Sequence, residues 1–215
     1  MGPPGAGCET CGHASHAFPE LPESYVYLLG IYLGDGCISA HRRGVFRLRV
    51  FLDSGYPGIV DEVVAAMAEV MPGNRVARHC HPSNYATADG GAKTCVGVSS
   101  YSKSWPCLFP QHGPGKKHER RIALAGWQWE LVERSPELLL RGLIHSDGCR
   151  FMNTGRGGWR NPRYSFSNLS PGIRWIFFDV CDLLELHATW AAPKTIYVSR
   201  KADVARMDEF IGPKA

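Results

Sequence analysis

The chain has 215 residues, of which 44% are hydrophobic and 20% charged, so we expect one or two globular domains with a buried core. The formal charge of +4, with nine further histidines, fits a polyanionic partner but excludes few enzyme classes. The beginning lacks the pattern of a secretion signal, and the longest apolar stretch, residues 25–33, is too short to span a bilayer. We therefore expect a cytoplasmic protein without a membrane partner, whose eight cysteines are reduced.

Residues 1–20 form a tail that contains four potential zinc ligands in a C-x2-C-x-H-x2-H pattern. Zinc favours tetrahedral sulfur and nitrogen ligands, but zinc fingers generally place a longer loop between the two ligand pairs. A zinc knuckle and a flexible tail with incidental cysteines both remain open, and residues 79–81 (His-Cys-His) could complete a site in which only two of the four bind. The four potential ligands are Cys8, Cys11, His13 and His16.

The first half, residues 21–114, shows an ordered change of periodicity. A helix is expected from residues 22–24 to the Asp-Gly pair at Asp35, followed by a short strand from Cys37. Arginine alternates with apolar residues over 46–52, which predicts a strand. Helical spacing of apolar residues then predicts a second helix from Pro57. A strand pair at 75–81 and 94–98 and a last helical piece complete the half.

The second half repeats this order after a linker. The segment 112–121 is rich in glycine, proline and charge, which indicates a boundary near residue 115. Residues 115–134 are therefore a linker and connecting helix, although the helical part from 121 onward could belong to either side. In the half at 135–215, Ser135 can cap a helix that ends at Asp147. Strands at 149 and 163–168, a helix from Pro171, strands at 188–190 and 195–198, and a final helix follow.

Three matches in the same order mark the repeat. Residues 28–38 return as 139–151, Pro-Gly-Ile at 57–59 returns at 171–173, and Lys93-Thr94 returns as Lys194-Thr195. Because a repeated sequence predicts that the same structural unit occurs twice, we predict an α/β (α+β) fold of two αββαββα units with two antiparallel sheets. The protein would then be a monomer with internal pseudo-twofold symmetry.

The two helices that end in Asp-Gly each carry small residues four positions apart, which places them on one face. They are Gly30 and Gly34 in the first helix and Gly142 and Ser146 in the second. Small residues let helices cross near backbone contact, which would bring Asp35 and Asp147 together. Neighbouring carboxylates repel unless a cation neutralises them, and Mg²⁺ favours carboxylate and phosphate oxygens. The pattern therefore indicates metal-assisted phosphodiester cleavage, against the alternative of two ordinary helices ending in Asp-Gly turns.

The two segments, LLGIYLGDG at 28–36 and LRGLIHSDG at 140–148, resemble the LAGLIDADG motif of homing endonucleases. The resemblance covers roughly residues 22–213 and implies two αββαββα halves whose sheets form a saddle over DNA. It also implies that Asp35 and Asp147 are the catalytic acids and bind Mg²⁺ or another divalent cation, helped by the backbone carbonyls of Gly34 and Ser146.

The chain departs from the motif at its first acidic position, which tolerates variation in the family. Leu33 and His145 stand there. Active sites of this kind usually add a basic residue near the scissile phosphates, and Lys93 and Lys194 are candidates for that catalytic role. The alternative is that both are solvated loop lysines.

DNA contacts are expected on the strand face opposite the core, where every second side chain is accessible to a groove. Arg47 and Arg49 satisfy this alternation. Other arginines in the strands and hairpin loops could reach phosphates or guanine edges, or be ordinary surface residues. These are Arg42, Arg43, Arg75, Arg78, Arg150, Arg156, Arg160 and Arg163.

The hypothesis is a freestanding, site-specific endonuclease that cuts double-stranded DNA at a long target, asymmetric because the halves differ in sequence. Two alternatives keep the scaffold: a DNA-binding transcriptional regulator that does not cut, and an intron RNA maturase. The presence of both aspartates favours cutting. Cys37 and Cys149, which follow the Asp-Gly pairs, are expected to be buried packing residues.

Overall fold

The computed structural model describes residues 21–86 and 92–212, which form two compact units. The first unit contains Asp35–Gly113 and the described residues before Val26. The second contains Val26–Gly34 and the described residues from Pro114 onward. Most of the first helix, α1 (Ser24–Asp35), therefore belongs to the second unit, although the chain continues from it into the first.

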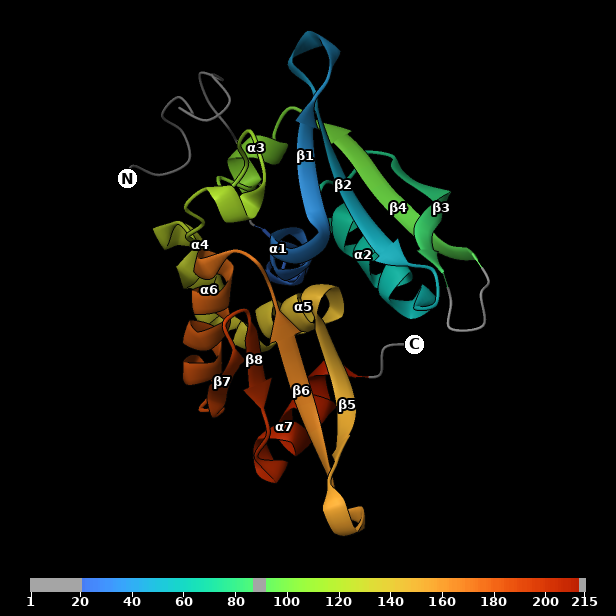
Figure 1. Cartoon of the computed structure of the whole chain (residues 1–215). Coiled ribbons are helices and arrows are strands. Elements are labelled where there is room, and N and C mark those ends of the chain that lie inside the picture. Colours follow the sequence, from blue (N-terminus) through green and yellow to red (C-terminus); the bar gives the residue numbers. More distant parts are fainter. Residues whose placement is uncertain (1–20, 87–91, 213–215) are drawn as a thin grey trace. The chain divides into compact units, whose positions relative to one another are not determined.

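The first unit is built on an antiparallel sheet in the order β1-β2-β4-β3 (Figure 1). Its helix α2 (Pro57–Val70) lies against one face, toward which Leu48, Val50 and Val98 bury their side chains. A 3-10 turn (Arg42–Gly44) joins the first two strands, and a single helical turn, α3 (Trp105–Leu108), follows the sheet. The strands are β1 (Gly36–Ala40), β2 (Phe46–Asp53), β3 (Val76–Ala86) and β4 (Ala92–Ser102).

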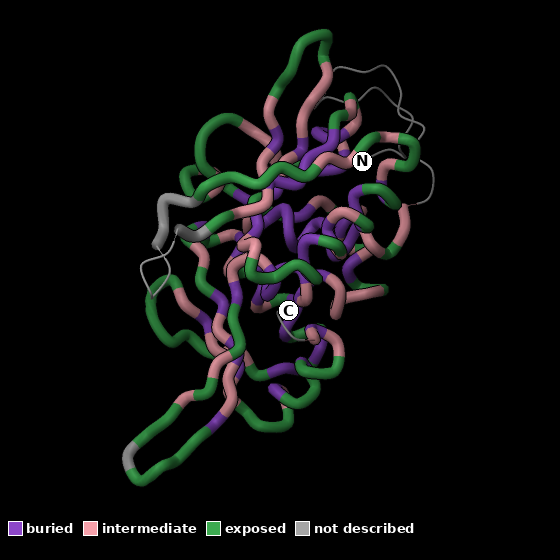
Figure 2. Tube along the Cα trace, turned by 90° about the vertical axis from the view of Figure 1, so that its right-hand side faces the viewer, coloured by how far each residue is buried: buried purple, intermediate pink, exposed green. Residues whose placement is uncertain are grey.

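The second unit contains a matching antiparallel sheet in the order β5-β6-β8-β7. Phe166 of β6 stacks on Phe177 of α6, with ring centroids 4.5 Å apart, so α6 covers one face of this sheet. The strands are β5 (Gly148–Thr154), β6 (Arg160–Ser167), β7 (Ala188–Ala192) and β8 (Thr195–Val198). The helical segments are η2 (Lys117–Glu119), α4 (Gly126–Arg134), α5 (Pro136–Asp147), η3 (Arg156–Gly158), α6 (Pro171–Leu183) and α7 (Lys201–Ile211). In Figure 2 residues 154–155 and 157–160, near the tip of the β5–β6 hairpin, are exposed.

Glycine allows α1 and α5 to touch through their backbones. A Cβ added to Gly30 would lie 2.5 Å from the carbonyl oxygen of Leu139 and 2.9 Å from the Cα of Gly142. A Cβ added to Gly142 would lie 2.9 Å from the amide nitrogen of Ile31 and closer still to the carbonyl oxygen of Tyr27. No side chain fits between the helices at this point, so the close crossing predicted from the small residues is confirmed.

The predicted duplicated αββαββα order is confirmed, with local differences in length. The last helical piece of the first half is only the one turn of α3, and β3 and β4 form a longer hairpin than the alternation indicated. Of the ambiguous residues 121–134, only Gly126–Arg134 are helical. None of the described helices is long and apolar enough to cross a membrane.

The prediction that Cys37 and Cys149 are buried was wrong. Cys37 is half-buried and Cys149 is exposed, because alternation from the buried Gly36 and Gly148 directs the next side chain away from the helix-covered face. No disulfide joins the described cysteines.

Candidate functional site

The end of the α1–α5 helix pair brings the Asp147 carboxylate against the backbone of Gly34. A Cβ on Gly34 would lie 2.5 Å from the Cβ of Ser146 and 2.9 Å from Oδ2 of Asp147, so only glycine fits there. Both helices end at an aspartate, Asp35 in α1 and Asp147 in α5, and both aspartates are half-buried. Asp35 follows Gly34 directly, and consecutive Cα atoms are about 3.8 Å apart. The Asp147 carboxylate thus lies against the residue that precedes the other predicted catalytic acid.

Asn168, which follows strand β6, orients the Asp147 carboxylate. Its Nδ2 donates to Oδ2 of Asp147 over 2.5 Å, while its Oδ1 accepts from the amide of Ser170 at 2.7 Å. Arg174 donates from Nη1 to the Asn168 carbonyl at 2.6 Å. Sequence reasoning missed Asn168. The repeat gave no signal for it, because the offset between the two Pro-Gly-Ile segments aligns Asn168 with Ser54, whose hydroxyl donates to the carbonyl of Thr94.

A lysine from the linker, Lys117, binds the last turn of α1. The sequence had placed this residue in the linker without a role. Lys117 donates from Nζ to the carbonyl oxygens of Tyr32, Leu33 (3.0 Å) and Gly34 (3.1 Å), and lies 4.8 Å from the centroid of the Tyr32 ring. These carbonyls belong to the last turn of α1, where helices leave carbonyl groups without intrahelical donors.

The predicted metal ligands fit a divalent cation only in part. The Asp147 carboxylate offers oxygen atoms of the kind that Mg²⁺ favours. The carbonyl of Gly34 instead accepts a hydrogen bond from an ammonium group, which would repel a second cation at the same oxygen. Among residues 21–86 and 92–212, no group of three or more histidine, cysteine, aspartate or glutamate side chains is arranged to hold a metal.

His145, at the first acidic position of the second motif, is a buried structural residue. Its Nε2 lies 3.0 Å from the carbonyl of Ile211, and its Nδ1 lies 3.0 Å from the Tyr27 hydroxyl. Because a carbonyl only accepts, Nε2 carries a hydrogen and donates it to Ile211. Arg141 also donates to the Ile211 carbonyl, at 2.7 Å. Helix α5 therefore holds the end of α7, which gives this departure from the motif a structural role.

The first sheet presents arginines and aromatic rings on the face opposite α2. The guanidinium of Arg47 lies 5.4 Å from the centroid of the Tyr101 ring, and its Nη2 donates to Ser99 Oγ at 3.0 Å. Arg49 lies 5.9 Å from the centroid of the Phe51 ring. Ring contacts hold these cations against the sheet, so this face combines positive charge with flat apolar surface.

The second sheet has the same combination on the face opposite α6. The guanidinium of Arg163 lies 5.6 Å from the ring centroid of Tyr197 and 6.0 Å from that of Trp159. Phe151, on the neighbouring strand, contacts Tyr197 with ring centroids 5.8 Å apart. Both sheets therefore carry an arginine supported by aromatic rings at equivalent places in the repeat.

Two predicted DNA-binding arginines instead pair with helices on the covered faces. Arg78 donates to Asp61 of α2 at 2.6 Å. Arg150 binds Asp208 of α7 through Nε at 2.7 Å and Nη2 at 2.8 Å, and the Tyr164 hydroxyl donates to the same carboxylate at 2.7 Å. The hydrogen bond from Arg150 holds the pKa of Asp208 below its ordinary value, and burial raises the pKa of Tyr164.

The remaining predicted residues are dispersed. Arg42, Arg43, Arg75, Arg160 and Lys194 are exposed in or beside turns. Lys93 lies in β4 and Arg156 in η3, but their side chains fall outside the described part of the chain. The zinc candidates Cys8, Cys11, His13 and His16 also lie outside the described residues. Near the suggested second half of that zinc site, Cys80 alternates with His79 and His81 along β3, so it faces the other side of the sheet.

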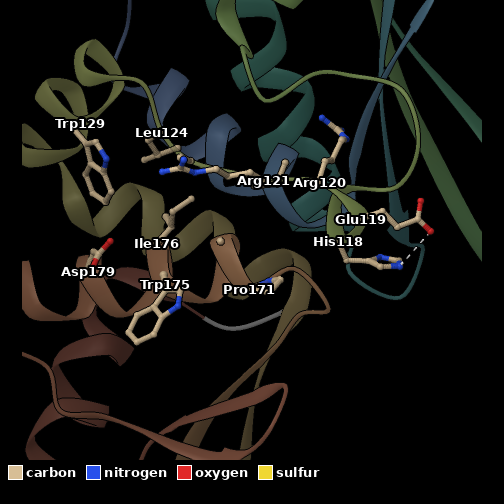
Figure 3. A pocket seen from close by; sticks show the side chains of 13 residues that line it. His118, Glu119, Arg120, Arg121, Leu124, Trp129, Pro171, Trp175, Ile176 and Asp179 are labelled. Atoms are coloured by element: carbon tan, nitrogen blue, oxygen red, sulfur yellow. Dashed lines mark ion pairs between the residues drawn. The ribbon is translucent and has the colours of Figure 1, made fainter.

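A separate hollow of about 500 Å³ lies where the linker packs on α6 and α4 (Figure 3). Linker residues 118–124 form one wall, and Trp129, Trp175 and Asp179 line other parts. A Cβ on Gly172 would lie 3.0 Å from the carbonyl carbon of Ile122, so the linker rests directly on the start of α6. The hollow is thus formed by the anchoring of the linker.

The architecture and the paired helix ends define a duplicated αββαββα protein of the LAGLIDADG fold, as the two motifs predicted. No protein-family model matches the sequence, and no curated protein matches it significantly. The homing endonuclease I-WcaI, solved bound to its DNA recognition sequence, is similar with a TM-score of 0.56 and 14% identity, covering 91% of this chain and 84% of that one. The LAGLIDADG meganuclease I-AabMI, solved bound to uncleaved DNA, gives 0.51 and 9%, covering 86% and 82%.

A third similar structure is full-length DUF199/WhiA from Thermatoga maritima, with a TM-score of 0.50 and 13% identity. The match covers 91% of this chain but 58% of that one. At these identities the likeness concerns the fold.

Proposed function

We propose that this protein is a site-specific endonuclease for double-stranded DNA, with Asp35 and Asp147 as its cleavage centre. The observation that carries the proposal is the Asp147 carboxylate lying against Gly34, the residue before Asp35, at the ends of two helices in backbone contact. Such contact fixes carboxylates in place, as a catalytic constellation requires.

DNA binding is assigned to the sheet faces that the helices leave uncovered. Arg47 and Arg49 on the first sheet and Arg163 on the second lie over aromatic rings, which limits their conformations before DNA arrives. Arginine is suited to phosphate oxygens and to the O6 and N7 atoms of guanine. The DNA-bound states of I-WcaI and I-AabMI support this choice of partner.

For cleavage, Asp35 and Asp147 are the residues that would hold a divalent cation. A bound cation would neutralise phosphate charge and lower the pKa of an attacking water. The chain's own part is to place the carboxylates: Asn168 fixes the orientation of Asp147 by its hydrogen bond, and the glycine contacts fix the helix ends. Lys194, which is exposed before β8, remains a candidate for contact with the phosphate.

A second candidate function is DNA binding without cleavage. The observation in its favour is the Lys117 ammonium on the Gly34 carbonyl, an atom that the motif resemblance assigns to a metal ion.

The test separates the two candidates in one reaction. Wild-type protein and the Asp35→Asn, Asp147→Asn and double variants are incubated with a randomised duplex library and Mg²⁺, and both cut ends and bound sequences are determined. We expect specific cuts by wild type and selective binding without cuts by the double variant. Binding without Mg²⁺-dependent cuts by wild type would establish the second candidate, and absence of selective binding would overturn both.

A further inference from the structure

Lys117 binds the end of α1 through its side-chain ammonium. Its ammonium donates to three successive carbonyls, those of Tyr32, Leu33 and Gly34. An ammonium has three hydrogens, so it has enough donors for all three carbonyls. The residue is half-buried, whereas its neighbours Lys116 and His118 are exposed.

The linker is built to hold Lys117 in this position. On its C-terminal side, Ile122 packs against Gly172 at the start of α6. On its N-terminal side, the amide of Lys116 donates to Glu119 Oε2 at 3.4 Å, closing the 3-10 turn that contains Lys117. A lysine on a loop fixed at both sides loses less conformational freedom when it binds than a lysine on a mobile chain.

The electrostatics of the helix end explain why a cation belongs there. The carbonyls of a final helical turn carry roughly half a negative elementary charge, and α1 adds the carboxylate of Asp35 at its last residue. The Asp147 carboxylate lies against Gly34 from α5. A positive charge on the Gly34 carbonyl lowers the repulsion that this concentration of negative groups would otherwise produce.

We propose that Lys117 is a built-in cation that takes the place of a divalent metal ion at the Gly34 carbonyl. The inference deepens the proposed function, since it concerns the same pair of aspartates. Wild-type protein therefore binds fewer divalent ions than the full set of motif ligands would allow, and removal of the ammonium opens a site for another ion.

The experiment counts Mn²⁺ ions bound to the full chain, by calorimetry and by the loss of the electron paramagnetic resonance signal of unbound Mn²⁺. The proteins are wild type, Lys117→Met, Lys117→Gln and the control Lys116→Met, which removes a neighbouring exposed lysine of the same linker. We expect each Lys117 variant to bind one more Mn²⁺ than wild type and Lys116→Met to match wild type. Adding Asp147→Asn to Lys117→Met should abolish the extra site.

A second measurement covers the case in which loss of Lys117 weakens folding. If the ammonium substitutes for a metal ion, Mn²⁺ should raise the melting temperature of the Lys117 variants more than that of wild type. Equal Mn²⁺ stoichiometry, with equal thermal shifts, in wild type and the variants would overturn the inference. Because neither measurement needs DNA, a wild-type protein that fails to cut DNA would overturn the endonuclease proposal and leave this one standing.

Discussion

The side-chain amide of Asn168 donates a 2.5 Å hydrogen bond to the carboxylate of Asp147, so a residue beyond the second motif sets the orientation of the proposed catalytic acid. Residues that orient metal-binding groups commonly contribute 10–100-fold to metal affinity or activity. We expect Asn168→Ala to lower the rate of DNA cleavage by about 10–100-fold with little change in DNA affinity. Single-turnover cleavage and filter binding measure the two. Ser54→Ala, at the aligned position of the other half, is the comparison, and a parallel loss of DNA affinity would contradict the assignment.

Replacing Gly142 by alanine should separate α1 from α5. The new Cβ would lie 2.9 Å from the Ile31 amide and 3.0 Å from the Gly30 Cα, so backbone has to move. Overpacking typically costs about 1–3 kcal/mol, and we expect the unfolding free energy of the variant to fall by that much or more. Urea denaturation measures it. Gly126→Ala is the matched control because its added Cβ meets nothing within 4 Å, and similar unfolding midpoints for the two variants would rule out the close crossing.

Arginines on the two faces of the sheet should differ in their effect on DNA binding. Arg47→Ala removes a cation from the uncovered face, whereas Arg78→Ala removes one that pairs with Asp61 of α2. We expect Arg47→Ala to weaken DNA binding. If Arg47 contacts a base, the binding free energy should fall by about 1–3 kcal/mol. If it contacts a phosphate, the slope of the logarithm of the binding constant against the logarithm of the salt concentration should decrease in magnitude by about 1. Arg78→Ala should leave affinity near wild type. Fluorescence anisotropy over a salt series distinguishes these outcomes, and equal losses would refute the assignment of faces.

The Asp208 carboxylate should make stability depend on acid. The hydrogen bond from Arg150 holds its pKa below the ordinary value of 3.8, so its stabilising effect is complete above that value and is lost as pH falls through the lowered pKa. We expect wild type to exceed Asp208→Asn in unfolding free energy at neutral pH, with the difference shrinking below about pH 4. Denaturation across this range is the measurement. A difference that grows on acidification would have the wrong sign for this pair.

The repeat made most of the fold predictable. The periodicities around Asp35 and Asp147 gave the ends of α1 and α5, and the glycines gave the helix crossing, because both depend on local spacing. The alternation of side chains along β3 also predicts where Arg78 points. Arg78 is two residues from Val76, so both side chains lie on the face of the sheet that α2 covers.

Contacts that depend on the path of the linker were not predictable in this way. Lys117 is one basic residue in a charged segment, and only the folded route of that segment carries it to the carbonyls of α1. Its pairing joins residues more than 80 positions apart, without a periodic pattern to reveal it. Arg150 also has its partner, Asp208, on a helix 58 positions away.

Because Val26–Gly34 belong to the second unit, a cut between the two halves of the sequence would remove a helix from that unit. A fragment that starts at Pro114 would lack the helix that covers Gly142, leaving a strip of bare backbone and apolar side chains open to aggregation. A chimera that joins this second half to a foreign first half would need a foreign helix with glycine at the point of contact. Compatibility of that helix with Gly142 is therefore a condition for such an exchange to fold.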